Sequence, residues 1–117
     1  PVTAVEQMVG LVEKTGHEHG VEHPIQMTIA TSDGTSIWAF RYSSEGDSRS
    51  LYFSTRMDSL HALYPENEQL AGLSEETRVV VSEPLGDLAG AWNEVPESHY
   101  GIVQPGQDVL EPFAPRS

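Results

Sequence analysis

The first twenty residues carry apolar side chains at helical spacing. An amphipathic helix buries one stripe at positions i, i+3, i+4 and i+7, and four residues follow that spacing: Val5, Met8, Val9 and Val12. Thr3 followed by Glu6 fits a capping box, in which each side chain satisfies a free backbone N–H at the start of the helix. Gly16 suits the left-handed residue that ends many helices. The pattern predicts a helix over residues 3–15.

After Pro24 the apolar period changes from helical to alternating. Residues 26–31 and 36–42 are rich in β-branched and aromatic side chains and are separated by a Ser-Asp-Gly-Thr turn. Asp-Gly tolerates the positive φ angles of a tight hairpin turn, so these segments predict two paired strands. Alternation in the second strand places Trp38, Phe40 and Tyr42 on one face, which we expect to carry the helix or a second layer.

Three weaker signals follow the hairpin. Residues 51–55 predict a short third antiparallel strand after a polar, turn-rich segment. Met57, Leu60 and Tyr64 predict one short helical turn, which Pro65 ends, with a loop after it. The unbroken valine run within residues 78–82 is typical of a central strand buried on both faces.

The end of the chain predicts a second hairpin. Segments 100–104 and 109–113 flank Pro105-Gly106, a pair suited to the two central positions of a β-turn. The predicted fold class is α+β: five or six strands, mostly antiparallel, with one main N-terminal helix, in a single domain spanning residues 1–117.

Charge and composition exclude several classes of partner and of catalytic or metal site. Acidic residues outnumber basic ones by 18 to 6, and the net charge of −12 disfavours nucleic acids and anionic membranes as partners. No apolar stretch approaches the roughly 20 residues of a membrane span, and no signal peptide opens the chain, so the default expectation is a soluble, cytoplasmic protein. The chain has no cysteine, which excludes disulfides, thiolate zinc sites and a cysteine nucleophile within these 117 residues.

The densest group of potential metal ligands is His17, His19 and His23. An extended chain would point His17 and His19 to opposite sides, and the neighbouring glycines indicate a solvated connection rather than a fixed site. We therefore favour a surface loop over a metal site, and predict no cofactor.

Other catalytic arrangements have equally ordinary explanations. Serines, histidines and aspartates are numerous, but no G-x-S-x-G elbow presents a serine as a nucleophile. The pairs Glu75-Glu76 and Glu66 with Glu68 fit a solvated loop face better than a glycosidase pair.

Neither the chain start nor the glycine-rich stretch adds a site. Pro1 could act as a base only if its amine were held in a pocket, whereas chain ends usually fray. The stretch Gly86–Gly90 lacks the spacing and the lysine of a phosphate loop. No residue is assigned a catalytic, cofactor-binding or metal-binding role.

Two segments are more distinctive than the candidate groups described above. Ser82-Glu83-Pro84-Leu85 stands at the exit of the valine strand, and Trp92-Asn-Glu-Val-Pro96 follows it. Their structural interpretation is that Ser82 and Glu83 cap or cross-link nearby backbone while Trp92 covers the end of the core.

These two segments carry a resemblance to a known family. Together with Ala30–Gly34 in the first hairpin and Ser50–Ser54 in the third strand, they resemble, in order and spacing, the C-terminal half of the class II glutamine amidotransferases of the small stand-alone bacterial branch. The likeness covers roughly residues 3 to 113. It implies half of an N-terminal-nucleophile hydrolase fold, a four-layer α/β/β/α sandwich.

In that family an N-terminal cysteine attacks the glutamine amide, and its own α-amine serves as the base. The cysteine, the glutamine-holding residues and the oxyanion hole lie in the N-terminal half, so none has a matching position here. The resemblance thus implies a chain that is the C-terminal part of such an enzyme and inactive alone, with the N-terminal half, or a second copy bound through a sheet face, as its partner. The alternative is a free-standing, non-catalytic α+β binding or assembly domain.

Overall fold

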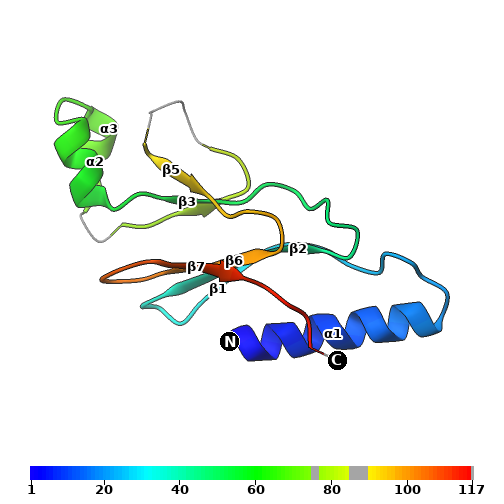
Figure 1. The fold of residues 1–117 in the computed structure, drawn as a ribbon. Coiled ribbons are helices and arrows are strands. Elements are labelled where there is room, and N and C mark those ends of the chain that lie inside the picture. Colours follow the sequence, from blue (N-terminus) through cyan, green and yellow to red (C-terminus); the bar gives the residue numbers. More distant parts are fainter. Residues whose placement is uncertain (75–76, 85–89, 117) are drawn as a thin grey trace.

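A computed structural model describes residues 1–74, 77–84 and 90–116 (Figure 1). Its helices and strands, in chain order, are α1 (Val2–Glu18), β1 (Gln26–Ser32), β2 (Ile37–Ser43), β3 (Tyr52–Ser54), α2 (Met57–Leu63), α3 (Glu68–Ala71), β4 (Val80–Val81), β5 (Trp92–Glu94), β6 (His99–Val103) and β7 (Val109–Pro112). The described part of the chain is therefore α+β, as predicted.

Two antiparallel sheets form the centre of the fold. The larger has strand order β1-β2-β6-β7, and the smaller has β4-β3-β5. Helix α1 lies along one side of the four-stranded sheet and the three-stranded sheet lies on the other side, while α2 and α3 stand at one end (Figure 1). The layers are thus a helix, a sheet and a second sheet. They correspond to three of the four layers of the α/β/β/α sandwich that the family resemblance implies.

The first core cluster lies between α1 and the four-stranded sheet. Phe40 and Val9 are fully buried there. The Phe40 ring lies tilted against Tyr100 and edge-to-face with Phe113, with ring centroids 6.0 and 5.7 Å apart. Trp38 and Tyr42 pack against the same cluster. The prediction that the aromatic face of β2 carries the helix is confirmed.

A second cluster joins the two sheets. Ala39 and Val103 of the larger sheet pack against Leu51, Phe53 and Val95 on and beside the smaller one. We expected a partner to bind through a sheet face, namely the one opposite the helix. In the structure the three-stranded sheet covers that face.

The ends of α1 differ from the prediction. The helix begins at Val2 and no side chain caps it, since Glu6 instead accepts hydrogen bonds from the Arg116 side chain and the Ala114 amide. It continues past Gly16 to Glu18, and the left-handed residue is Gly20, with φ of 79°. The capping box is therefore wrong, because Glu6 binds the tail instead, and the stop at Gly16 is wrong, because the positive-φ glycine that follows the helix is Gly20.

The apolar stripe of α1 is also rotated. Val9 is buried, but Met8 and Val12 are 45% and 37% exposed. The C-terminal tail lies against the helix at Gly10, where an added Cβ would stand 1.8 Å from the Arg116 carbonyl oxygen. Because the tail takes this face, Met8 and Val12 turn toward solvent together with Leu11.

Both predicted hairpins are confirmed, β1 with β2 and β6 with β7. Gly34 has φ of 94° in the first turn, and the Asp33 carboxylate accepts hydrogen bonds from the Thr35 and Ser36 amides at 2.9 Å each. Those amides, Ser36 foremost, hold the pKa of the Asp33 carboxyl below its ordinary value. The Asp-Gly signal thus has a direct physical basis.

Three elements after residue 64 were predicted incorrectly. The valine run forms the two-residue strand β4, which is half-buried at the edge of its sheet rather than central. Trp92–Glu94 forms β5, which was not predicted as a strand. Helix α3 replaces the expected loop, and the Asn67 side chain caps it by accepting a hydrogen bond from the Leu70 amide at 3.0 Å.

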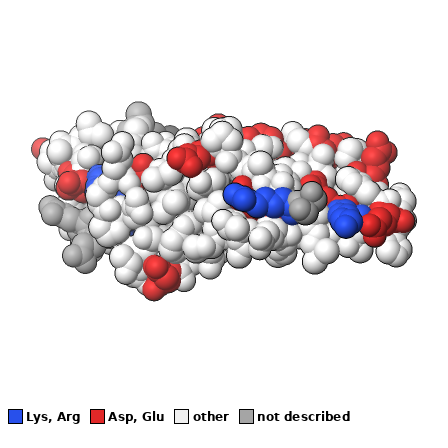
Figure 2. All heavy atoms as spheres, turned by 60° about the horizontal axis from the view of Figure 1, so that its bottom comes forward, with Lys and Arg blue, Asp and Glu red and all other residues white. Residues whose placement is uncertain are grey.

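The molecule is elongated, with extents of 56 × 26 × 18 Å and a radius of gyration of 16.4 Å. A compact domain of this length has a radius near 13 Å. The accessible surface of 7138 Å² also exceeds the roughly 6,300 Å² typical of this mass. On the face that carries α1, acidic side chains are spread widely and the basic groups form a short band (Figure 2).

Candidate functional site

The two segments that carry the resemblance lie on either side of β3. Ser82 follows β4 and Trp92 begins β5, and β3 separates these strands in the sheet. Two strand spacings amount to roughly 10 Å, so the segments do not form one constellation. Leu85 lies outside the described residues.

The contacts of these segments support the structural interpretation for Trp92, whereas Ser82 takes part through its main-chain oxygen rather than through its side chain. The Ser50 hydroxyl donates a 2.8 Å hydrogen bond to the Ser82 carbonyl, which ties the exit of β4 to the start of β3. Trp92 packs against a small cluster that includes Met57 and Leu60 of α2. It covers the end of the core where α2 meets the smaller sheet.

The three clustered histidines do not converge. His17 Nε2 lies 3.1 Å from the Glu22 carbonyl oxygen, and His19 Nδ1 lies 2.8 Å from the Thr15 carbonyl oxygen. His23 faces the Glu22 carboxylate at 3.8 Å. In residues 1–74, 77–84 and 90–116, no group of three or more potential ligands is placed to hold a metal ion.

The remaining candidate residues are scattered. Pro1 is exposed at the start of α1, and Glu66 and Glu68 are exposed beside α3. Glu75-Glu76 and most of the Gly86–Gly90 stretch lie outside the described residues. Of these groups, the structure brings none of the described ones, Pro1, Glu66 and Glu68, into a shared site.

A buried serine and a half-buried carboxylate, which the sequence analysis did not single out, meet beside the larger sheet. The Ser48 hydroxyl donates to the Glu97 carboxylate, and the Arg41 guanidinium contacts both residues. His99 Nδ1 lies 2.8 Å from the main-chain oxygen of Glu97, not from its carboxylate. Within the described residues no hydrogen bond links a serine hydroxyl to a histidine ring, so this cluster lacks the geometry of a serine triad.

Arg41 gives the cluster a structural role. Its Nη1 donates to the Val95 carbonyl oxygen at 2.9 Å and lies 3.5 Å from Glu94. Since Arg41 belongs to β2 and the other two residues belong to or follow β5, the guanidinium joins the two sheets. No local sequence pattern predicts this contact, because the partners lie more than fifty positions apart.

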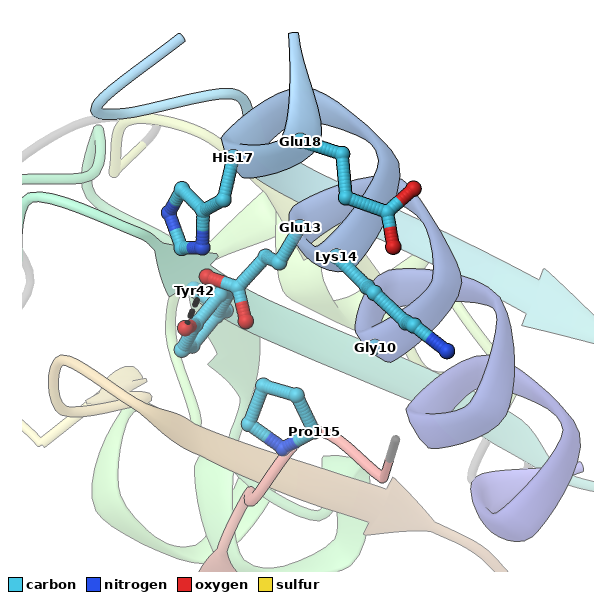
Figure 3. A pocket seen from close by; sticks show the side chains of 7 residues that line it. All are labelled: Gly10, Glu13, Lys14, His17, Glu18, Tyr42 and Pro115. Atoms are coloured by element: carbon cyan, nitrogen blue, oxygen red, sulfur yellow. Dashed lines mark hydrogen bonds between the residues drawn. The ribbon is translucent and has the colours of Figure 1, made fainter. Parts of the chain in front are cut away.

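One cavity, of about 540 Å³, lies beside α1 (Figure 3). Glu13 projects from the helix toward Tyr42, whose hydroxyl donates a 2.6 Å hydrogen bond to the Glu13 carboxylate. Ser44 donates to the same oxygen at 2.7 Å. Burial, and then the Glu13 carboxylate, raises the pKa of the Tyr42 phenol well above its ordinary value. Glu13 therefore fastens α1 to the sheet rather than acting as a free base.

A second cavity, of about 590 Å³, opens at the other end of the fold and is named here the turn-end pocket. Both hairpin turns of the four-stranded sheet and the start of α2 lie at this end (Figure 1). It is lined by residues in and beside the two turns and by two arginines from other segments. The lining residues are Ser32, Gly34, Thr35, Ile37, Arg56, Arg78, Val103, Gln104, Pro105 and Gly106. Nothing in the local sequence marks it, because four separate segments build it.

Arg78 is firmly positioned in this pocket. Its two terminal nitrogens contact the Asp108 carboxylate at 3.1 and 2.5 Å, and Nη2 also donates to the Ser54 carbonyl oxygen at 2.9 Å. The buried Nε has no hydrogen-bond partner in the part of the chain that the structure describes.

Comparison with protein-family models and with curated proteins finds no match. Among solved structures, the chain is similar over its whole length to the glutamine aminotransferase class-II domain protein from Silicibacter pomeroyi, with a TM-score of 0.75 and 24% sequence identity. The alignment covers 45% of that protein, so this chain spans less than half its length. No helix among the described residues is long and apolar enough to cross a membrane. The structural match shows that the chain has the fold of part of a class II glutamine aminotransferase domain protein. This agrees with the resemblance predicted from the sequence.

Proposed function

We propose that this chain is the C-terminal part of a class II glutamine amidotransferase whose catalytic nucleophile lies in a preceding half. The parent would hydrolyse a γ-glutamyl amide to glutamate and ammonia or an amine. The single observation that carries the proposal is the structural match, which includes all of this chain but only 45% of the matched protein.

The side chains of this chain fit the half of an enzyme that does not carry the nucleophile. Amide hydrolysis through a covalent intermediate requires an activated nucleophile with a base in hydrogen-bond reach. The 117 residues contain no cysteine, and the serine that is buried beside a carboxylate, Ser48, has no imidazole partner among the described residues. The chain would thus supply scaffold to the parent and no thiolate.

The exposed apolar surface also fits a part of a larger fold. The outward side of the three-stranded sheet, as strand alternation assigns it, carries half-buried Tyr52 and Val81. On α1, Leu11 is 64% exposed beside Met8 and Val12. We propose that these two surfaces contact the remainder of the parent fold, which would also account for the elongated shape.

The reading frame ahead of Pro1 tests this proposal. An initiator methionine followed by cysteine and by a segment of about the same length as this chain would support an amidotransferase parent. A start codon directly before Pro1 would contradict the proposal and favour the alternative, a free-standing binding or assembly domain. The cavity at the hairpin turns is the observation that favours that second candidate, since its two arginines and apolar side chains suit the binding of a small ligand.

A further inference from the structure

The turn-end pocket gathers positive charge in a strongly acidic protein. Only six residues of the chain are basic, and two of them, Arg56 and Arg78, line this one cavity. The formal net charge of the chain is −12. A cavity with two guanidinium groups is therefore a local exception to the surrounding potential.

The two arginines differ in how much of their charge is free. Asp108 neutralises Arg78 through a two-point contact, and the Arg78 side chain is only 11% exposed. Arg56 is half-buried, and no carboxylate of the described residues lies within ion-pair distance of it. The net charge that the two arginines and Asp108 present to the pocket is thus close to a single positive charge.

The rest of the wall suits a small molecule with an apolar body. Ile37 and Pro105 provide apolar surface beside the arginines. Thr35 of the first turn adds a polar side chain, whereas the Ser32 hydroxyl donates within the turn to the Ser36 carbonyl oxygen. The volume of about 590 Å³ falls within the range of ligand cavities, roughly 300–1,000 Å³.

We propose that the turn-end pocket binds a small monocarboxylate, with the carboxylate on Arg56 and its carbon chain against Ile37 and Pro105. A guanidinium matches a carboxylate in planar, two-point geometry, and one free positive charge matches one negative charge. Arg78 and Asp108 hold the pocket open between β3 and the second turn. The inference does not depend on the proposed amidotransferase parent.

Amide NMR spectra of the 117-residue chain, titrated with sodium butanoate, test the proposal. Gly34 and Gly106 line the pocket and serve as reporters, whereas Gly20 and Gly46 lie outside its lining and serve as references. Butanoate should shift the two reporter amides saturably and leave the references in place. Butanamide has the same shape without the charge and should bind about tenfold more weakly or not at all.

Two variants separate a specific site from general charge attraction. Arg56→Gln should weaken butanoate binding about tenfold. Arg49→Gln makes the same change of charge at an exposed arginine outside the pocket, and should leave the affinity within about twofold.

Several results would overturn the proposal: no saturable shift of Gly34 and Gly106, equal binding of butanoate and butanamide, or equal effects of the two arginine variants. Tighter binding of inorganic phosphate than of butanoate would contradict the single-charge assignment. If Arg56→Gln fails to fold, the comparison of butanoate with butanamide on the unaltered chain still decides the question.

Discussion

The Glu6 carboxylate accepts a 2.8 Å hydrogen bond from Arg116 Nε, a contact that joins helix α1 to the C-terminal tail across 110 positions of the chain. Glu6 is only 7% exposed, and its main-chain oxygen also accepts the Arg116 amide at 2.9 Å. The tail thereby closes over the helix next to Phe113, a member of the first core cluster. Its attachment contributes to the stability of the whole helix–sheet layer.

Replacing Gly10 by alanine should displace the tail, because the new Cβ would overlap the Arg116 carbonyl. We expect a loss of about 1–3 kcal/mol in the free energy of unfolding, measured by urea denaturation. In a chain that ends at Phe113, the same substitution should instead stabilise by up to about 1 kcal/mol through helix propensity. Equal effects in both chains would show that the tail does not pack on Gly10.

Replacing Phe40 by alanine should be the most damaging of the core changes. Phe40 is fully buried between α1 and the sheet, so truncation leaves a cavity in the first core cluster. The expected loss in unfolding free energy is about 3–5 kcal/mol. Ile29→Ala on the neighbouring strand is the control, since Ile29 is 39% exposed and should cost less than about 1 kcal/mol. Similar losses for both would contradict the described core.

Stability should fall as the pH rises above 10.0, the ordinary pKa of tyrosine. Burial and Glu13 raise the pKa of Tyr42, while a hydrogen bond to Glu111 and then burial raise the pKa of Tyr100. The unfolded chain therefore loses these protons at lower pH than the folded chain, which destabilises the fold progressively above that value.

Urea denaturation between pH 8.5 and 11.5 measures this effect (about one and a half units either side of the tyrosine value). Tyr42→Phe should flatten the alkaline loss of stability. Tyr52→Phe is the matched control, because Tyr52 belongs to neither carboxylate pair. An unchanged alkaline slope in Tyr42→Phe would rule out this linkage.

The isolated chain should associate through its exposed apolar surfaces, and more strongly at high salt. Association would bury apolar area around Leu11 of α1 and Tyr52 of the smaller sheet, while a net charge of −12 opposes it at low ionic strength. Sedimentation at two ionic strengths measures the effect. A monomer at both, with no binding of a dye that reports apolar surface, would contradict the proposal that these faces contact other parts of a parent fold.

The sequence predicted the elements whose signals are local. Asp33-Gly34 determines its own turn, and strand alternation in β2 placed Phe40 on the helix side. The errors arose where distant partners decide the outcome. Glu6 binds the tail instead of capping the helix, and the valine run is held at a sheet edge by β3 alone.

The functional features were harder to predict for the same reason. The turn-end pocket takes residues from two hairpin turns and from the segments around Arg56 and Arg78, which no linear pattern connects. The Ser48–Glu97 contact joins residues 49 positions apart. The likeness to class II amidotransferases could be recognised because it depends on the order of several segments rather than on one site.

The most direct test of the account is a glutamate-release assay on two proteins: residues 1–117 alone, and the product translated from the first codon of the gene. We predict no glutamate release above blank from residues 1–117, because the chain has no thiol. The longer product should release glutamate from glutamine or another γ-glutamyl amide, and should lose this activity when its N-terminal cysteine is changed to serine. Glutamate release by residues 1–117 that survives repurification would contradict the account.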